Sequence, residues 1–312
     1  MIDARSAPAV LDIHRLRVLP EATRFALDVS GWHVSPGECV ALIGKNGSGK
    51  SSMMEACLGF RHAQVLEGSI LGARFTAWPR RADLRHDVGA LLQRTAPPPG
   101  LYVRDMVSLH RQLYRRSSVQ VHDALGLGAL ASRKFDTLSR GEVQRVELFM
   151  ALAHEPKLAF LDEPFTGLDA HFAAAASELI SQRGERTIVM CCHGEAELAL
   201  ASRITWIAEG SIQADAAPVE FRRRLLSGYR LRARFTDEAS ARGFVRHPQV
   251  ANAGGVRCAE DGTVFISSED EQVIAQVRAL LATQTLLAFE AGSSTLTDLL
   301  AHCAATASAP EY

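Results

Sequence analysis

The sequence predicts an α/β fold with a mixed sheet, followed by a small α+β domain. Short apolar runs recur at 39–43, 88–92, 158–161 and 187–192, and each has the length of one buried strand. A glycine-rich loop follows the first run and leads into a helical pattern, as in folds that alternate strands and helices. Past residue 222 the pattern changes, so we place the two domains at 1–222 and 223–312.

The composition is that of an ordinary globular protein. Apolar residues make up 47% of the chain and charged residues 22%, and 34 basic residues nearly balance 35 acidic ones. Because binding to a polyanion draws on excess positive charge, we expect no nucleic acid partner. The basic run at 222–224 is better explained as the solvated face of a linker.

Two features bear on the compartment. No apolar segment approaches the ~18 residues of a membrane-spanning helix, and residues 1–5 lack the apolar core of a signal peptide. We therefore expect a cytoplasmic protein that reaches a membrane only through a partner. Six cysteines show no C-x-x-C spacing, so we expect reduced core thiols and no metal site: Cys39, Cys57, Cys191, Cys192, Cys258 and Cys303.

The chain opens with two predicted antiparallel strands. Apolar positions alternate through 11–18 and 24–34, and the turn at 35–38 ends the second run. These strands would form a wall before the buried strand 39–43. A helix at 52–58 ends at Gly59, and a short strand and turn follow at 67–72.

The loop between strand and helix carries a phosphate-binding motif. Gly44-Lys45-Asn46-Gly47-Ser48-Gly49-Lys50-Ser51 fits G-x-x-x-x-G-K-[ST] at every fixed position, and Ser52 opens the helix. Its glycines let backbone amides face a phosphate, while the helix N-terminus adds positive charge. Lys50 would reach the β- and γ-phosphates of a nucleoside triphosphate, and Ser51 would bind Mg²⁺.

The middle of the chain leaves the sheet and returns to it. Three prolines within 96–100 interrupt regular structure, and a helical insert is predicted at about 97–137. The insert's predicted apolar face consists of Met106, Val107, Leu109, Leu113 and Tyr114. An ordinary connection of the α/β core is the alternative. Ser139 and Glu142 then have the spacing of a capping box, which begins another helix.

Polar residues follow three of the buried strands. Asp162 and Glu163 end the run 158–161, at the strand end where open α/β sheets bind ligands, and Asp169 comes shortly after. Gln93 and His193 end two other strands. Taken singly, each residue has a plain structural explanation, and a satisfied core histidine is the ordinary one for His193.

The ordered set is more specific than any single motif. The phosphate loop, Gln93, Ser139-Arg140-Gly141-Glu142, Asp162-Glu163, Asp169 and His193 together resemble the ATP-binding cassette (ABC) ATPases over about residues 10–220. The resemblance implies a P-loop NTPase cassette with a mixed sheet core, an antiparallel β wall and a helical insert. It also implies an ATPase that uses ATP and Mg²⁺.

The resemblance assigns roles by position. Glu163 would act as general base or polarise the attacking water, and His193 would hold the γ-phosphate and that water in line. Lys50 and Gln93 would complete the catalytic set. The implied Mg²⁺ ligands are Ser51, Gln93 and Asp162.

A second cassette is implied as well. Ser139 and Gly141 would bind the γ-phosphate of another subunit's ATP, with Asp169 as a further nucleotide contact. One cassette per chain therefore implies a homodimer, or a heterodimer with a similar chain. Such a dimer would drive separate integral membrane permease subunits, peripheral on the inner face of the cell membrane.

Some positions depart from the family pattern. Arg140 and Glu142 stand where glycine and glutamine are commonest, and a basic residue at the first of these positions occurs in the branch that drives type 2 exporters. Lys45 replaces a common proline. No aromatic residue stands at 17–20 to stack on adenine, so adenine must be held in another way or more weakly.

The predicted C-terminal domain alternates strands and helices. Strands are expected at 231–235, 255–258, 263–266 and 285–289, with helices at 237–246, after a capping box formed by Ser268 and Glu271, and around Leu296. The order is similar to C-terminal extensions of type 2 exporter ATPases. Regulation and dimer contact stand as hypotheses beside a purely stabilising role.

The sequence favours the ATPase subunit of a membrane exporter. An importer ATPase and a soluble ABC ATPase of translation or DNA maintenance are the alternatives. A single cassette and the short span from Lys50 to Ser139 argue against the soluble classes. A binding module without turnover would be expected to lack Glu163 or His193, and both are present.

Overall fold

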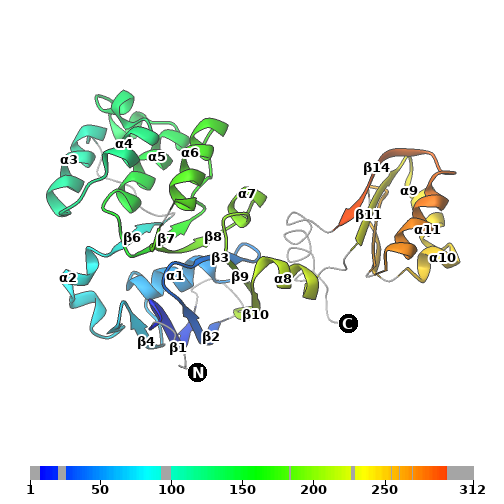
Figure 1. Ribbon diagram of the computed structural model, residues 1–312, viewed down its shortest axis with the longest axis horizontal. Coiled ribbons are helices and arrows are strands. Elements are labelled where there is room, and N and C mark those ends of the chain that lie inside the picture. Colours follow the sequence, from blue (N-terminus) through cyan, green and yellow to red (C-terminus); the bar gives the residue numbers. More distant parts are fainter. Residues whose placement is uncertain are drawn as a thin grey trace, which may run out of the picture. The chain divides into compact units, whose positions relative to one another are not determined.

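The computed structural model describes residues 8–19, 26–92, 100–182, 184–225, 229–253, 255–259, 261–268 and 270–293. Gln93 and the predicted last helix around Leu296 lie outside these residues. Contacts divide the chain into two compact units, Met1–Ala216 and Ala217–Tyr312 (Figure 1). The division falls before helix α8 (Pro218–Leu225), whereas the sequence pattern placed the boundary at residue 222.

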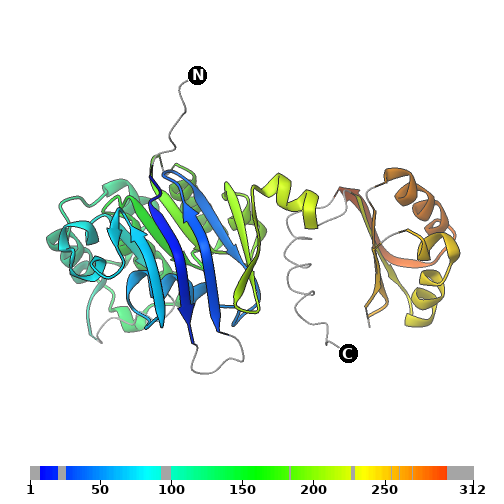
Figure 2. The same ribbon diagram turned by 90° about the horizontal axis from the view of Figure 1, so that it is seen from below.

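An antiparallel sheet forms the predicted wall. Its strands are β1 (Leu11–Val18), β2 (Leu27–Val34), β4 (Val65–Ile70) and β5 (Ala73–Arg74), in the order β2-β1-β4-β5 (Figure 2). Alternate residues of β1 and β2 are buried, as the polar and apolar alternation predicted. A register shift between Ile13 and Arg15 moves the buried set by one residue, so that Leu16 and Val18 stay in the core.

The second sheet is mixed, and it confirms the predicted fold class. Its order is β10-β9-β3-β8-β7-β6, and every neighbouring pair from β9 to β6 is parallel. Only β10 runs antiparallel, against β9. The strands are β3 (Cys39–Ile43), β6 (Val88–Leu91), β7 (Leu158–Asp162), β8 (Thr187–Cys191), β9 (Arg203–Ala208) and β10 (Ser211–Ala216). All residues of β3, β7 and β8 are buried, which explains their unbroken apolar sequences.

Helix α1 (Lys50–Leu58) lies between the two sheets. Its residues Met53, Met54 and Cys57 belong to one hydrophobic core with β3 and the wall strands. Gly59 adopts the left-handed conformation and ends the helix, as predicted, with φ of 81°. Because α1 is covered on several sides, it has no amphipathic pattern, and the residue at which it begins could not be predicted from periodicity.

Helices occupy the predicted insert. They are α3 (Val103–Leu113), α4 (Val119–Ala124) and two short 3₁₀ helices (Leu127–Leu130, Phe135–Thr137), followed by α5 (Arg140–Leu152). The predicted apolar face of α3 was partly wrong, because Leu109 and Leu113 are exposed. The buried positions are Val103, Val107 and His110. Because one of the buried positions is a histidine, counting hydrophobic residues did not identify the buried face of α3.

That histidine belongs to a buried pair. His110 Nε2 lies 3.4 Å from His154 Nδ1, and His154 Nε2 lies 3.2 Å from the carbonyl oxygen of Val88 on β6. Since that oxygen only accepts, His154 Nε2 donates, and Nδ1 is left to accept from His110. Burial lowers the pKa of His110 and of His154 to about 4, so both are neutral. The pair joins the insert to the edge of the sheet.

The remaining helices of the first unit are short connections and one longer element. They are a 3₁₀ helix (Trp78–Arg80), α2 (Ala82–Arg85), α6 (Ala170–Ser181) and α7 (Glu195–Leu198). Among the helices of the described residues, none has both the length and the apolar character needed to cross a membrane.

The second unit is a four-stranded antiparallel sheet with helices on one face (Figure 1). Its strands are β11 (Tyr229–Phe235), β12 (Gly255–Cys258), β13 (Thr263–Ser268) and β14 (Leu286–Ser293), in the order β12-β13-β11-β14. Helix α8 begins the unit, and the helices packed on the sheet are α9 (Glu238–Val245), α10 (Pro248–Ala251) and α11 (Glu271–Leu281). One core of residues from both layers holds them together.

The predicted capping box of Ser268 and Glu271 is wrong. Ser268 still belongs to β13, where it pairs with Tyr229, so its backbone is committed to the sheet. The carboxylate of Asp270 caps α11 instead, accepting from the amide of Gln272 at 2.8 Å. The Ser268 hydroxyl accepts from the Asp270 amide and forms the turn before the helix.

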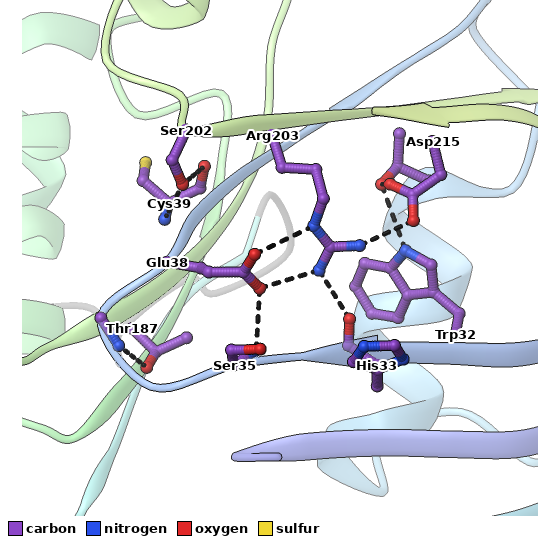
Figure 3. Close-up of polar contacts among 11 residues, drawn as sticks. Trp32, His33, Ser35, Glu38, Cys39, Thr187, Ser202, Arg203 and Asp215 are labelled. Atoms are coloured by element: carbon purple, nitrogen blue, oxygen red, sulfur yellow. Dashed lines mark hydrogen bonds and ion pairs between the residues drawn. The ribbon is translucent and has the colours of Figure 1, made fainter. Parts of the chain in front are cut away.

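One polar network ties the wall to the mixed sheet (Figure 3). Arg203 on β9 donates to both carboxylate oxygens of Glu38, to the carboxylate of Asp215 at 2.7 Å and to the backbone oxygen of His33 at 2.6 Å. Only 15% of the Arg203 side chain is exposed. A guanidinium with so many fixed partners holds the end of β2, the turn after it and strands β9 and β10 in one arrangement.

Further hydrogen bonds extend the network around Arg203. Thr205 donates to Asp215 at 2.7 Å and accepts from the indole of Trp32 at 3.1 Å. The Ser35 amide donates to Glu38 at 2.7 Å. The polar groups named here therefore exchange water for protein partners at this junction.

We expect Arg203→Met to lower the free energy of unfolding by about 3 kcal/mol, because two carboxylates would lose their shared cation in a largely buried place. Urea unfolding would measure the change. Arg15→Met, which removes an exposed arginine from β1, is the matched control and should have little effect. Equal losses in the two variants would contradict a special role for the Arg203 network.

Candidate functional site

The phosphate loop turns sharply between β3 and α1 and holds its lysine in place. Lys50 Nζ donates to the carbonyl oxygens of Gly44 at 2.7 Å and Lys45 at 3.0 Å. Burial lowers the pKa of Lys50, and nearby Cys191, Asp162 and Glu163 act against that shift. The ammonium group is thus oriented inside the loop, within the field of the two carboxylates.

Two glycines of the motif are required, Gly44 by packing against backbone and Gly49 chiefly by its backbone conformation. A Cβ at Gly44 would lie 2.1 Å from the carbonyl oxygen of Ile207, and one at Gly49 would lie 2.8 Å from Leu27 Cδ1. Both have positive φ, 145° and 111°. The loop is therefore pressed against β9 and β2, and its amides stay free of side chains.

The loop fits a phosphate ligand. The hydroxyl of Ser48 is buried and finds no hydrogen-bond partner among the described residues, which is unusual for a buried polar group. Asn46 and Gly47 are exposed at the tip, while Ser51 and Ser52 occupy the first turn of α1. An anion at the helix N-terminus would meet donors from this turn.

Two carboxylates come from the end of β7. Asp162 is almost fully buried, and β7 pairs it with Cys191 of β8. Burial, followed by the charge of Asp162, raises the pKa of the Cys191 thiol, so this cysteine stays protonated. Glu163 follows in the left-handed region with φ of 51°, which turns its side chain out of the strand direction.

Side chains on both sides hold the Glu163 carboxylate. Thr166 Oγ1 donates to Oε2 at 3.0 Å, and His193 Nε2 lies 3.2 Å from Oε1. Glu197 in turn accepts from the amides of His193 at 2.7 Å and Gly194 at 2.9 Å. Burial raises the pKa of Glu197, while these two amides act against the shift. A chain of contacts therefore runs from β7 across to the residues after β8.

Neither Thr166 nor Glu197 was predicted from the sequence. Thr166 lies three residues after Glu163 in the turn that follows β7, a spacing that allows a local hydrogen bond. Glu197 is the third residue of α7, where a carboxylate reaches back to free amides at the helix start. The second spacing is visible in the sequence and could have been found.

The capping box at the start of α5 is confirmed. The Ser139 hydroxyl accepts from the Glu142 amide at 3.3 Å, and the Glu142 carboxylate accepts from the Ser139 amide at 2.8 Å. Arg133 donates to the other oxygen of Glu142. The Ser139 amide contributes most to lowering the pKa of Glu142, and Arg133 adds to it. The negative charge that departs from the family pattern is therefore countered within the chain.

Gly141 and Asp169 lie on opposite sides of one close contact. A Cβ at Gly141 would lie 2.3 Å from the carbonyl oxygen of Gly167, so α5 packs directly on the turn before α6. Asp169 ends that turn and caps α6 by accepting from Phe172 at 3.0 Å. These contacts explain both residues without a ligand, and their predicted nucleotide contacts stay predictions.

An open pocket of about 540 Å³ separates the end of β7 from α5. Its lining includes Leu92, Arg140, Gln144, Asp162, Glu163 and Thr166. The described residues thus bring the helix that begins at Ser139 close to the carboxylates. Gln93, which directly follows Leu92 in the chain, lies outside the described residues.

The donors also suit Mg²⁺. The Ser51 hydroxyl and the Asp162 carboxylate are oxygen ligands, and Mg²⁺ completes its shell with water and substrate phosphates. In the described part of the chain, no three histidine, cysteine, aspartate or glutamate side chains gather as a metal-binding group. A cation at this place would therefore depend on a bound phosphate for much of its coordination.

Comparisons with known proteins show which sequences this chain resembles. The sequence profile described as "ABC transporter" matches residues 27–166. The chain is 32% identical to an aliphatic sulfonates import ATP-binding protein of Pseudomonas fluorescens over 211 residues, covering 66% of this chain and 76% of that protein.

Solved structures agree in fold. The structure of an ATP-binding subunit of an ABC transporter has a TM-score of 0.59 at 24% identity, covering 69% of this chain and 92% of that one. A dimeric bacterial ABC transporter cassette has a TM-score of 0.56 at 20% identity, covering 66% and 98%. At these identities the likeness concerns the fold alone.

We expect Lys50→Ala to weaken ATP binding about 100-fold, because two hydrogen bonds from a cation to phosphate oxygens would be lost. Titration calorimetry with ATP would measure the change. Lys157→Ala is the control, since Lys157 is exposed and pairs with Asp87 at the opposite end of β7. ATP affinity that survives in Lys50→Ala would count against the phosphate-loop assignment.

Proposed function

This chain belongs to the ATP-binding proteins of ABC transporters, and we propose that it binds and hydrolyses ATP to drive separate membrane permease subunits. The observation that carries the proposal is the placement of Glu163. Its carboxylate is held between Thr166 and His193, beside the loop that orients Lys50. This is the arrangement that attack of water on a terminal phosphate requires.

Each of the site residues has a separate role in hydrolysis. Lys50 exchanges its carbonyl partners for β- and γ-phosphate oxygens and counters their charge. Mg²⁺ held by Ser51, Asp162 and Gln93 would neutralise the remaining phosphate charge. Glu163 accepts the proton of the attacking water, or polarises it. His193, fixed through its backbone by Glu197, holds the water in line.

The second cassette supplies the far side of the site. We assign Ser139 and Gly141 to the γ-phosphate of a neighbouring subunit's ATP, because both stand at the N-terminus of a long capped helix with Ser139 exposed. Asp169 would touch the nucleotide from the adjoining turn. The partner cassette is a second copy of this chain or a similar chain.

Two observations bear on the direction of transport, and they favour opposite directions. The curated relative is named for the import of aliphatic sulfonates, and this supports import. The export predicted from the sequence rests on Arg140 and on the C-terminal unit, and the relatives do not support it. We therefore propose import first, with the chain attached to the inner face of the membrane through its permease.

We expect Glu163→Gln to lower ATP turnover at least about 100-fold while ATP affinity stays within about threefold, because the amide cannot accept a proton. ATP should then trap a dimer, which size-exclusion chromatography with light scattering would detect. Glu178→Gln, an exposed change on α6, is the control. Normal turnover in Glu163→Gln would show that another residue is the base.

Inverted membrane vesicles would test the membrane role and its direction. A tagged chain should co-purify with an integral membrane protein, and ATP added outside should empty vesicles that were loaded with an alkanesulfonate. Glu163→Gln should abolish this movement. Accumulation of substrate inside the vesicles would assign export, and the absence of any integral partner would refute the transporter proposal.

A further inference from the structure

Gln144 lies on the same helix as the capping box and reaches the backbone beside Glu163. Its side chain is buried, with 8% exposed. The amide Nε2 donates to the carbonyl oxygen of Glu163 at 3.0 Å and to that of Pro164 at 3.0 Å. Both hydrogens of one amide group are therefore used on two consecutive carbonyls.

These two carbonyls belong to the turn that aims the carboxylate. Glu163 adopts a left-handed φ of 51°, a conformation that non-glycine residues hold only when their surroundings fix it. Thr166 and His193 hold the carboxylate end of the side chain. At the backbone end, the carbonyl oxygen of Glu163 accepts from Gln144 at 3.0 Å and from the Thr166 amide at 3.2 Å, so Gln144 is the contact there that comes from another helix.

We propose that Gln144 is a positioning residue for ATP hydrolysis, which fixes the turn at Glu163 and couples its aim to the position of helix α5. The inference rests on the proposed role of Glu163 as the group that activates water. Gln144 lines the same pocket as Glu163, and its amide acts through the backbone of Glu163.

The coupling follows from the geometry of α5. Ser139 caps the helix and Gln144 lies five residues further along it, so both move with one rigid element. In the proposed dimer, the start of this helix contacts the neighbour's nucleotide. A small shift of the helix on ATP binding would therefore reach Glu163 directly through two hydrogen bonds.

A purely structural role would give a different pattern. A buried amide that only stabilises the fold would cost stability when it is removed, and activity would fall in step with the folded fraction. A positioning role alters turnover in protein that is fully folded and still binds ATP. Measuring kcat and the Kd for ATP alongside the melting temperature separates the structural role from the positioning role.

The test replaces Gln144 by methionine, which keeps the length of the side chain and removes both donors. We expect kcat for ATP hydrolysis to fall about 10- to 100-fold while the Kd for ATP stays within about twofold. ATP-bound dimers should accumulate, as expected for Glu163→Gln. Gln112→Met, the same change at an exposed glutamine of α3, should leave kcat unchanged.

A second control matches the loss of stability. Val146→Ala removes buried volume from the same helix without touching Glu163 through a hydrogen bond, so its melting temperature should fall while its kcat is kept. The double variant Gln144→Met, Glu163→Gln should be no slower than Glu163→Gln alone, because the two residues act as one unit. Multiplying losses would overturn the proposal.

The two variants distinguish a failure of the Gln144 role from a failure of the Glu163 role. If Glu163→Gln loses turnover and Gln144→Met keeps it, the positioning role is refuted and the catalytic role of Glu163 stands. If Glu163→Gln keeps turnover, both fail. Should Gln144→Met not fold, Gln144→Asn keeps the amide but withdraws it by one methylene, and the same loss of kcat with intact ATP affinity is expected. Normal kcat in that variant would refute the positioning role.

Discussion

Parallel pairing of β3, β8 and β7 is the constraint on which the site depends. The register sets Leu42 beside Cys191 and Asp162 beside Cys191 from the other side, so three strands end at one edge. The glycine-rich loop, the two carboxylates and His193 all follow those ends. Residues more than a hundred positions apart meet there because hydrogen bonds between backbones fix the strand order.

The site is an assembly of opposed charges, some buried and some partly exposed. Lys50 is buried with Asp162 and Glu163 close to it, and Glu142 is met by Arg133 and a backbone amide. The second arrangement explains how a glutamate stands in a place where the family commonly has glutamine. Its charge is neutralised locally, and the helix start keeps its positive end for an anion.

Much of the first unit could be predicted from the sequence. Unbroken apolar runs fixed the buried parallel strands, and the spacing of Ser139 and Glu142 fixed the start of α5. Prediction from the sequence failed where tertiary packing, and not the local residue pattern, decided the structure. His110 stands in the buried row of α3, so a hydrophobic count chose a face that was partly wrong, and Ser268 stayed in a strand that tertiary pairing extended.

The site shows the same division. Motif spacing predicted Lys50, Asp162, Glu163 and His193 as site residues, because those residues stand at fixed distances from strands and glycines, and the fold brings them together. The residues that orient them were missed, since Gln144 and Thr166 act through contacts that depend on the three-dimensional path of the turn after β7. Only Glu197 had a local signal.

The Arg203 network has a consequence for how such a protein changes over evolutionary time. Arg203 begins β9 and bonds Glu38, the residue just before β3, so the network sits at the end of the parallel strands opposite the phosphate loop. Substitutions there would alter how much of the chain is folded without touching the chemistry at the other end. Thermal stability and catalytic rate can therefore change independently during evolution, because they depend on opposite ends of the same sheet.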